Sequence, residues 1–300
     1  LLHLLPTSAY NNLMKISKKT LSTILFILAG ICILAAAILF LRGRMADRRM
    51  TETLEELRPT ASPEPVETTS AIESEPTTAA TQATSVEETT VSAEESDRIP
   101  NPYADSFLAN KDMAAWLQIP GTNIDYPVMW TPEDETCYLY RAFDGSENKN
   151  GCLLLDGDSC VDPLTTNLII HGHNMKSGAM FGNLTDYENK DFYETHKNII
   201  LYTEECQRNY EVIAVFRSQV YRKSDQVFKF YKFFQADTQE EFEDFYNNIK
   251  QLSQYDTGVT AEFGDHFLTL STCVYHVEQG RFVVVAKEVE PGDHYLPIQE

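Results

Sequence analysis

Apolar positions along the chain form one long run near the N-terminus and many short runs further on. Residues 20–41 contain no charged side chain, and arginines follow from Arg42 onwards. As a helix at about 1.5 Å per residue, this run spans about 33 Å, which is enough to cross a bilayer core of about 30 Å. It is longer than the apolar part of a cleaved signal peptide. The run therefore predicts an uncleaved signal-anchor.

The short apolar runs are rich in β-branched and aromatic residues and are separated by turn residues. This pattern predicts strands. Several short strands with turn signals between them favour a barrel or a sandwich. The predicted strands are residues 123–130, 152–155, 168–170, 198–202, 210–216, 267–272 and 282–287.

Two segments have apolar residues at helical spacing. In residues 103–118 this spacing predicts an N-terminal helix ahead of the strands. In residues 237–253 the apolar side chains share one face, and Thr238 and Glu241 have the spacing of a capping box. We therefore expect a long helix late in the chain, before the last two strands.

Charge divides the chain into three sections. Residues 1–50 hold seven Lys and Arg against one Asp, residues 51–98 hold two against twelve Asp and Glu, and the remainder holds fifteen against thirty-two. The net charge of −21 argues against nucleic acid as a partner.

Residues 51–98 consist mainly of Thr, Ser, Glu, Ala and Pro. Such a segment buries too little apolar area to offset the entropy of ordering, so it predicts a disordered linker with an r.m.s. span of roughly 40 Å. Residues 1–13 precede Met14 and differ in character from the rest of the chain, and we interpret them as an extension that is not native. The expected organisation is a cytoplasmic tail (1–19), a transmembrane signal-anchor (20–41), a linker (42–98) and a folded catalytic domain (99–300).

Candidate chemistry gathers in residues 266–287, where two apolar runs flank a turn that contains Gly280. If the runs pair antiparallel, Cys273 closes one strand and Arg281 opens the next. The guanidinium then favours the thiolate form of the cysteine and can bind an oxygen that becomes negative during acyl transfer.

A base for this thiol is available much earlier in the chain. His171 and His173 follow the predicted strand 168–170 and, at a spacing of two, point to one face of an extended strand. A cysteine with a histidine distant in sequence is the usual form of an activated thiol. Two alternatives stay open. His171, His173 and Cys273 are also a candidate zinc site, although a neighbouring arginine would repel the cation, and a surface module without catalysis has the same tethered organisation.

The remaining cysteines are expected to be structural. Five of the six cysteines lie outside the apolar run 20–41, so at least one thiol is free unless two chains are cross-linked. We interpret Cys137, Cys152 and Cys206 as buried, inert thiols. A bridge between Cys152 and Cys160 across a loop is an alternative.

Several motifs together resemble those of class B sortases. The resemblance covers residues 104–290 and rests on the combination, because the TLxTC pattern alone is only moderately specific. The motifs are TLSTC (269–273), HGHNM (171–175), WLQIPGTNIDYPV (116–128), residues 138–156 with an LLLD run, GAMFGNL (178–184) and Arg281. The resemblance implies a mainly β fold, a closed barrel of about eight strands with N-terminal helices and a long helix before the strand of the catalytic cysteine.

The resemblance also implies the roles of the site residues. Cys273 is the nucleophile, His173 is the acid and base, and Arg281 stabilises the oxyanion. We also expect Ser271 and Thr272 to line the substrate groove and the backbone N–H of Val274 to be a further oxyanion donor. No metal and no cofactor are expected.

The activity that the resemblance implies is that of a cysteine transpeptidase, a thiol peptidase of the hydrolase class. Such an enzyme cleaves the C-terminal sorting signal of surface proteins through a thioacyl intermediate and transfers them to an amine of the peptidoglycan in a Gram-positive cell wall. A sortase that polymerises pilins through a lysine acceptor is the alternative. The implied location is the cell membrane, crossed once, with the N-terminus inside and the catalytic domain on the cell-wall side.

Overall fold

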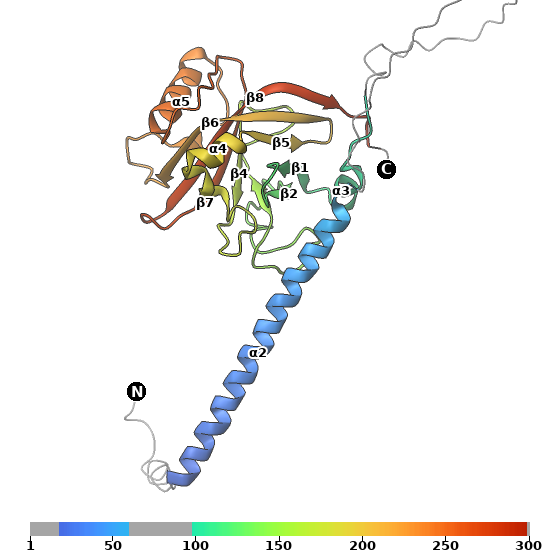
Figure 1. Ribbon diagram of the computed structural model, residues 1–300, viewed down its shortest axis with the longest axis vertical. Coiled ribbons are helices and arrows are strands. Elements are labelled where there is room, and N and C mark those ends of the chain that lie inside the picture. The colour runs from blue at the N-terminus through green and yellow to red at the C-terminus, as the bar shows by residue number, and fades with distance from the viewer. Residues whose placement is uncertain (1–17, 60–97, 299–300) are drawn as a thin grey trace, which may run out of the picture. The chain divides into compact units, whose positions relative to one another are not determined.

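The computed structural model describes residues 18–59 and 98–298 (Figure 1). The chain divides into two compact units, Leu1–Thr51 and Glu52–Glu300. The interpretation of residues 1–13 and the greater part of the predicted linker concern residues outside the described ranges.

Helix α2 (Lys18–Leu57) contains the whole apolar run of residues 20–41. Its length and composition are sufficient for crossing a membrane. The helix continues beyond this run, so the prediction of a disordered linker is wrong for residues 42–57. These residues are rich in Arg, Met, Ala, Leu and Glu, which favour helix, and Glu55 pairs with Arg58 at 3.8 Å one turn away.

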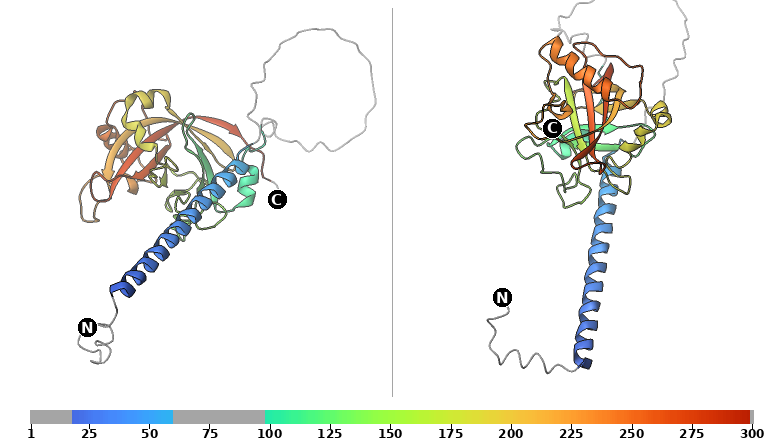
Figure 2. Two further views of the ribbon diagram at one scale, coloured as in Figure 1. Left: turned by 60° about the horizontal axis from the view of Figure 1, so that its bottom comes forward. Right: turned by 90° about the vertical axis from the view of Figure 1, so that its left-hand side faces the viewer.

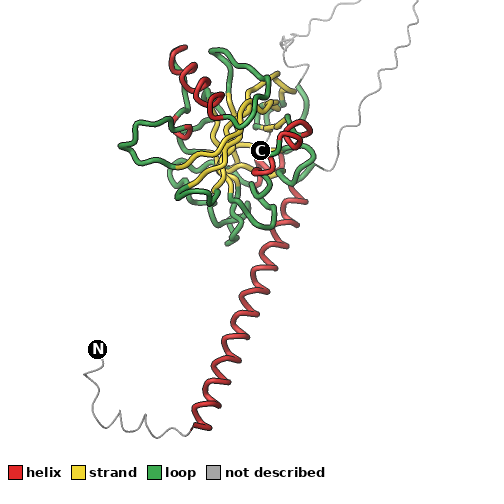
Figure 3. Tube along the Cα trace, turned by 60° about the vertical axis from the view of Figure 1, so that its left-hand side comes forward, coloured by secondary structure: helices red, strands yellow, loops and turns green. Residues whose placement is uncertain are grey.

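The second unit is built around eight strands that close into a barrel (Figures 2 and 3). The strands are β1 (Met113–Gln118), β2 (Asp125–Met129), β3 (Leu153–Leu155), β4 (Asn167–Gly172), β5 (Asn198–Tyr202), β6 (Cys206–Gln219), β7 (Phe267–Cys273) and β8 (Gly280–His294). The helical segments are α3 (Ala104–Ala109), η1 (Leu184–Glu188), α4 (Lys190–Thr195), η2 (Phe230–Lys232) and α5 (Gln239–Leu252). Around the barrel the strand order is β1-β2-β3-β4-β7-β8-β6-β5, which confirms the predicted closed, mainly β architecture.

Strand β1 replaces the second half of the predicted N-terminal helix. The helix α3 ends at Ala109, and the extended Asn110 accepts a hydrogen bond from the Asp112 amide on its side chain (3.0 Å). β1 then pairs with β2 on one side and β5 on the other, and five of its six residues are buried. A strand buried on both faces lacks the alternation of a half-buried strand. The helix predicted for residues 103–118 is therefore wrong beyond Ala109.

The other strand predictions are confirmed, but β6 and β8 are much longer than predicted. They pair antiparallel from Gln219 and Gly280 to Cys206 and His294, with shifts of register along the way. The apolar pattern predicted only the central part of each strand, because the ends of both strands carry polar and charged residues.

Helix α5 covers part of the outer face of the barrel beside β6, β7 and β8 (Figure 1). Its predicted capping box is confirmed, since the Glu241 amide donates to Thr238 Oγ1 (3.3 Å) and Glu241 Oε2 accepts from the Thr238 amide (3.1 Å). Its buried side chains form one apolar cluster with Ile213 and Phe216 of β6, Phe267 of β7, and Val283 and Val285 of β8.

Candidate active site

The predicted pairing of thiol and guanidinium is present at one end of the β7–β8 pair. The two strands are antiparallel, and Cys273 lies directly opposite Arg281. Side chains opposite each other in such a pair share a face, with Cβ atoms roughly 4.5–5.5 Å apart. Arg281 alternates with Val283 and Val285 along β8, so it shares the outer face that α5 covers further along. Cys273 is exposed.

The neighbouring strand β4 brings His173 to the same end. β4 and β7 are parallel, and their last pair is Gly172 opposite Thr272. The next residue on each side is His173 and Cys273. Two hydrogen bonds hold this end together, from Thr272 Oγ1 to the Gly172 carbonyl (2.7 Å) and from Asn174 Nδ2 to the Cys273 carbonyl (2.9 Å).

The ring of His173 has two further partners that the sequence did not reveal. Its Nε2 lies 2.8 Å from the carbonyl oxygen of Leu139. Tyr140 stacks on the imidazole, with ring centroids 5.4 Å apart and planes 27° from parallel. Both residues belong to the loop between β2 and β3, and no spacing or motif linked that loop to the histidine.

The predicted oxyanion donors are engaged with the β7–β8 turn, residues 274–279. Nη1 of Arg281 donates to the carbonyls of Gln279 (3.2 Å) and Gly280 (3.1 Å). The Val274 amide also donates to the Gly280 carbonyl (3.1 Å). In this conformation neither group is directed at a substrate oxygen. Arg281 engages these carbonyls through its side chain, whereas Val274 engages one through its backbone amide.

Ser271 and Thr272 are both buried, but they face opposite sides of β7. Thr272 alternates with Cys273, and its hydroxyl donates to β4, so it does not face the thiol. Ser271 shares the face of Cys273, and within the described part of the chain its buried hydroxyl has no hydrogen-bond partner. Leaving a buried hydroxyl unpaired costs about 1–3 kcal/mol. Of the two predicted groove residues, Ser271 alone shares the face of Cys273, and its side chain is buried.

His171 pairs with a carboxylate. Its Nε2 lies 3.1 Å from Asp156 Oδ2, just beyond β3. Burial raises the pKa of the Asp156 carboxyl, but the hydrogen bond and charge of His171 and the charge of Lys232 outweigh this effect, so its pKa lies below the usual value. His171 and His173 thus bind different partners, and the described residues contain no group of three side chains suited to a metal ion.

The other cysteines are separate thiols. No bridge joins Cys152 and Cys160, so that alternative is wrong. Cys152 and Cys206 are buried as predicted, and burial raises the pKa of the Cys152 thiol to about 12, which keeps it protonated and unreactive. Cys137 is only half-buried.

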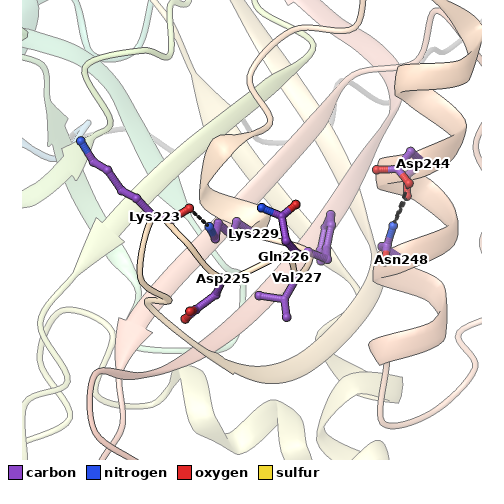
Figure 4. Close-up of a pocket in the computed structure, with 8 residues that line it drawn as sticks. Lys223, Asp225, Gln226, Val227, Lys229, Asp244 and Asn248 are labelled. Carbon is purple, nitrogen blue, oxygen red and sulfur yellow. Dashed lines mark hydrogen bonds between the residues drawn. The ribbon is translucent and has the colours of Figure 1, made fainter.

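A cavity of about 460 Å³ lies elsewhere, between α5 and the loop that follows β6 (Figure 4). Lys223, Asp225 and Lys229 of the loop and Asp244 and Asn248 of the helix are among the residues that line it. None of the predicted catalytic residues lines it. The cavity is open and its lining is charged, and it is separate from the site around Cys273.

The fold and this arrangement of thiol, imidazole and guanidinium define a cysteine-dependent acyl-transfer protein, and known proteins agree. The family described as "Sortase domain" matches residues 117–289. Sortase B of Listeria monocytogenes is 36% identical over 182 residues, which are 60% of this chain and 71% of that protein. Sortase B of Staphylococcus aureus is 28% identical over 186 residues, covering 60% and 72%.

Solved structures show the same likeness. Sortase B from Bacillus anthracis in complex with AAEK1 matches with a TM-score of 0.55 and 28% identity, covering 63% of this chain and 84% of that chain. A Staphylococcus aureus sortase B–substrate complex matches with a TM-score of 0.57 and 25% identity, covering 66% and 89%. Clostridium perfringens sortase B matches with a TM-score of 0.56 and 26% identity, covering 62% and 98%. The chain belongs to the sortase family, within class B.

Proposed function

We propose that this chain is a membrane-anchored cysteine transpeptidase that cleaves the C-terminal sorting signal of surface proteins and joins them to an amine of the peptidoglycan. The observation that carries the proposal is the strand register. Cys273 lies opposite Arg281 on β8, and it occupies the position next to the last β4–β7 pair, where His173 follows on β4. This register supports the proposal, because it brings the backbone positions of the three groups to the same end of three adjacent strands.

In the proposed first step, the thiolate of Cys273 attacks a backbone carbonyl of the sorting signal. The carbonyl oxygen becomes an oxyanion, which the guanidinium of Arg281 stabilises after leaving its turn carbonyls. The tetrahedral intermediate collapses as protonated His173 gives its proton to the departing amine. The products are a thioester on Cys273, a free amine and neutral His173.

In the second step, an acceptor amine attacks the thioester. Neutral His173 takes a proton from the attacking amine, and the thiolate of Cys273 leaves. The new amide bond joins the surface protein to the acceptor, and the enzyme returns to its starting state. Both proposed steps are acyl transfers with proton transfer, so they consume no oxidant or reductant.

The outer face of β4 and β7 supplies the proposed substrate groove. Ser271 lies one alternation before Cys273 on this face, roughly 7 Å away along the strand. Its hydroxyl is buried and unpaired, so it becomes a hydrogen-bond partner for the bound sorting signal only where substrate binding uncovers it. The apolar run of α2 is proposed as the single membrane anchor, with the barrel on the cell-wall side.

The test uses the full chain in detergent micelles with fluorogenic peptides that carry NPQTN-, NPKTG-, SPKTG-, PPKTG- and LPxTG-type signals. Diaminopimelate, triglycine and a lysine peptide serve as acceptors, so the products distinguish wall anchoring from pilin polymerisation. The expected result is cleavage that Cys273→Ala abolishes, with a new amide to one acceptor. Full cleavage by Cys273→Ala would refute the mechanism. If no peptide is cleaved and no thioacyl adduct forms on Cys273 by intact mass, the proposed activity is wrong.

A further inference from the structure

The imidazole of His173 is held on two sides by consecutive residues of one loop. The carbonyl of Leu139 accepts a hydrogen bond from Nε2 (2.8 Å), and Tyr140 stacks on the ring. Tyr140 is 60% exposed, so burial does not account for its position. Among the described residues, the ring of Tyr140 stacks with one other ring, the imidazole of His173.

The carbonyl partner determines which nitrogen carries the permanent proton. A carbonyl oxygen only accepts hydrogen bonds, so the nitrogen facing it must be N–H in the neutral as well as in the charged ring. In His173 that nitrogen is Nε2. The proton that is gained and lost is therefore carried by Nδ1, which has no hydrogen-bond partner within the described ranges 18–59 and 98–298.

The loop that supplies this carbonyl is anchored in the barrel unit. Tyr138 is buried, and its hydroxyl donates to Asp112 Oδ2 (2.8 Å) and accepts from Asn110 Nδ2 (2.9 Å). Gly151 adopts a positive φ of 62°, and a Cβ there would lie 2.3 Å from the Leu139 oxygen. The carbonyl is thus confined by a close backbone approach that glycine alone permits.

We propose that Leu139 and Tyr140 form an imidazole clamp, in which the carbonyl selects the Nε2–H tautomer of His173 and the tyrosine ring fixes the plane of the imidazole. Nδ1 is then the nitrogen that protonates the leaving amine and deprotonates the acceptor amine. Tyr140 is a positioning residue, because it acts through His173. The inference rests on the proposed function for its consequence in catalysis, but its tautomer assignment stands independently of activity.

The contributions of carbonyl and ring are separable. Loss of the stacked ring leaves the carbonyl bond possible but lets the imidazole tilt. Misplacing a catalytic group by about 1 Å costs up to about 100-fold in rate, and a partial tilt costs less. The expected effect is on kcat, because a positioning residue acts on the transfer step and not on substrate binding.

The experiment uses the full chain, labelled with ¹⁵N-histidine and reconstituted in liposomes. Magic-angle-spinning NMR distinguishes the two neutral tautomers and the imidazolium, and the signal that is lost in His173→Gln identifies His173. Tyr140→Phe keeps the ring, Tyr140→Ala removes it, and Tyr275→Ala is the matched control. Tyr275 is 94% exposed and lies two residues after Cys273. kcat and KM are measured for each variant with a cleaved sorting-signal peptide.

The expected result is an Nε2–H tautomer in the wild type, in Tyr140→Phe and in Tyr275→Ala. Tyr140→Ala should lower kcat by about tenfold with KM within about twofold, and broaden the His173 signals. An Nδ1–H tautomer in the wild type would overturn the proposal, as would an unchanged kcat and spectrum in Tyr140→Ala. A change in KM alone would make Tyr140 a substrate contact instead. If no peptide is cleaved, the tautomer still decides the clamp, while the proposed function fails on its own test.

Discussion

The outer face of β7 and β8 has two regions. Helix α5 covers one of them and leaves the other uncovered. In the covered region, Phe267, Val283 and Val285 pack with the helix and are fully buried. In the uncovered region, the same face carries Cys273, which is exposed, and Arg281, which is half-buried. One pair of strands therefore contributes to the apolar core at one end and carries the proposed catalytic groups at the other.

The end of the face that α5 covers is also the boundary between the buried apolar side chains and the exposed Cys273. Side chains on a covered face are mostly apolar and none of the fully buried ones is charged, because an unpaired buried charge is costly. Beyond the part of the face that α5 covers, the Cys273 thiol is exposed to water and is accessible to a substrate. Substitutions in the two regions should accordingly affect different properties, activity in the uncovered region and stability in the covered one.

The largest effect is expected from Cys273→Ala. Removing the nucleophile should lower the rate of sorting-signal cleavage by about 10³-fold or more. The residue is exposed, so the free energy of unfolding should change by less than about 0.5 kcal/mol. Peptide cleavage and denaturant unfolding measure the two quantities. A large loss of stability would contradict the assignment of this region to chemistry alone.

In the covered region, Phe245→Ala should reduce stability and spare catalysis. Phe245 is 1% exposed and stacks on Phe233 at 4.1 Å between centroids. Its truncation should cost about 3–5 kcal/mol, with the cleavage rate per folded molecule within about threefold. Unfolding followed by tryptophan fluorescence reports on the barrel, because Trp116 is fully buried there. The matched control on the same helix is Leu252→Ala, which is 43% exposed and should cost under about 1 kcal/mol.

Arg281→Lys should produce the next effect. Lysine keeps the charge but loses the planar fork, so the expected loss is about 100-fold in kcat/KM, or about 2.7 kcal/mol. The free energy of unfolding should stay within about 0.5 kcal/mol. The exposed Arg222→Lys is the control and should retain full activity. Wild-type kinetics for Arg281→Lys would mean that a positive charge alone suffices.

The smallest effect concerns the pH dependence of stability and involves Asp156, which pairs with His171 on β4, the strand beside β7. The pKa of Asp156 lies below its usual value in the folded chain, so its ionised form stabilises the fold above about pH 4, the usual unfolded value. This contribution is lost as the pH falls through the lowered folded value. Asp156→Asn should therefore lose less stability than the wild type between pH 6 and pH 3, by up to about 1 kcal/mol after solvent screening. Parallel unfolding curves at both pH values would refute this prediction.

The site shows where sequence reasoning succeeded. A glycine-containing turn between two apolar runs predicted that Cys273 and Arg281 would face each other, because a hairpin is a local structure. The capping box of α5 could also be predicted from the sequence, because its two residues lie only three positions apart.

Sequence reasoning failed where distant segments decide the outcome. Residues 113–118 have helical spacing but form β1, because pairing with β2 and β5 outweighs a weak local preference. Tyr140 and Leu139 lie more than thirty residues before His173, and nothing in their spacing predicted a contact. The engagement of Val274 and Arg281 with the turn carbonyls likewise depends on the exact path of the turn.

By itself, the sequence determined the apolar run of α2, most of the strands and the helix α5, and it predicted the thiol, imidazole and guanidinium that we propose as catalytic groups. These features depend on side-chain chemistry and on periodicity within about twenty residues. The tertiary structure alone decided that β1 is a strand, that α5 leaves one end of the outer face uncovered, and that a loop carbonyl and a tyrosine hold His173. Such features arise from contacts between segments far apart in the chain, and no local pattern encodes which segments meet.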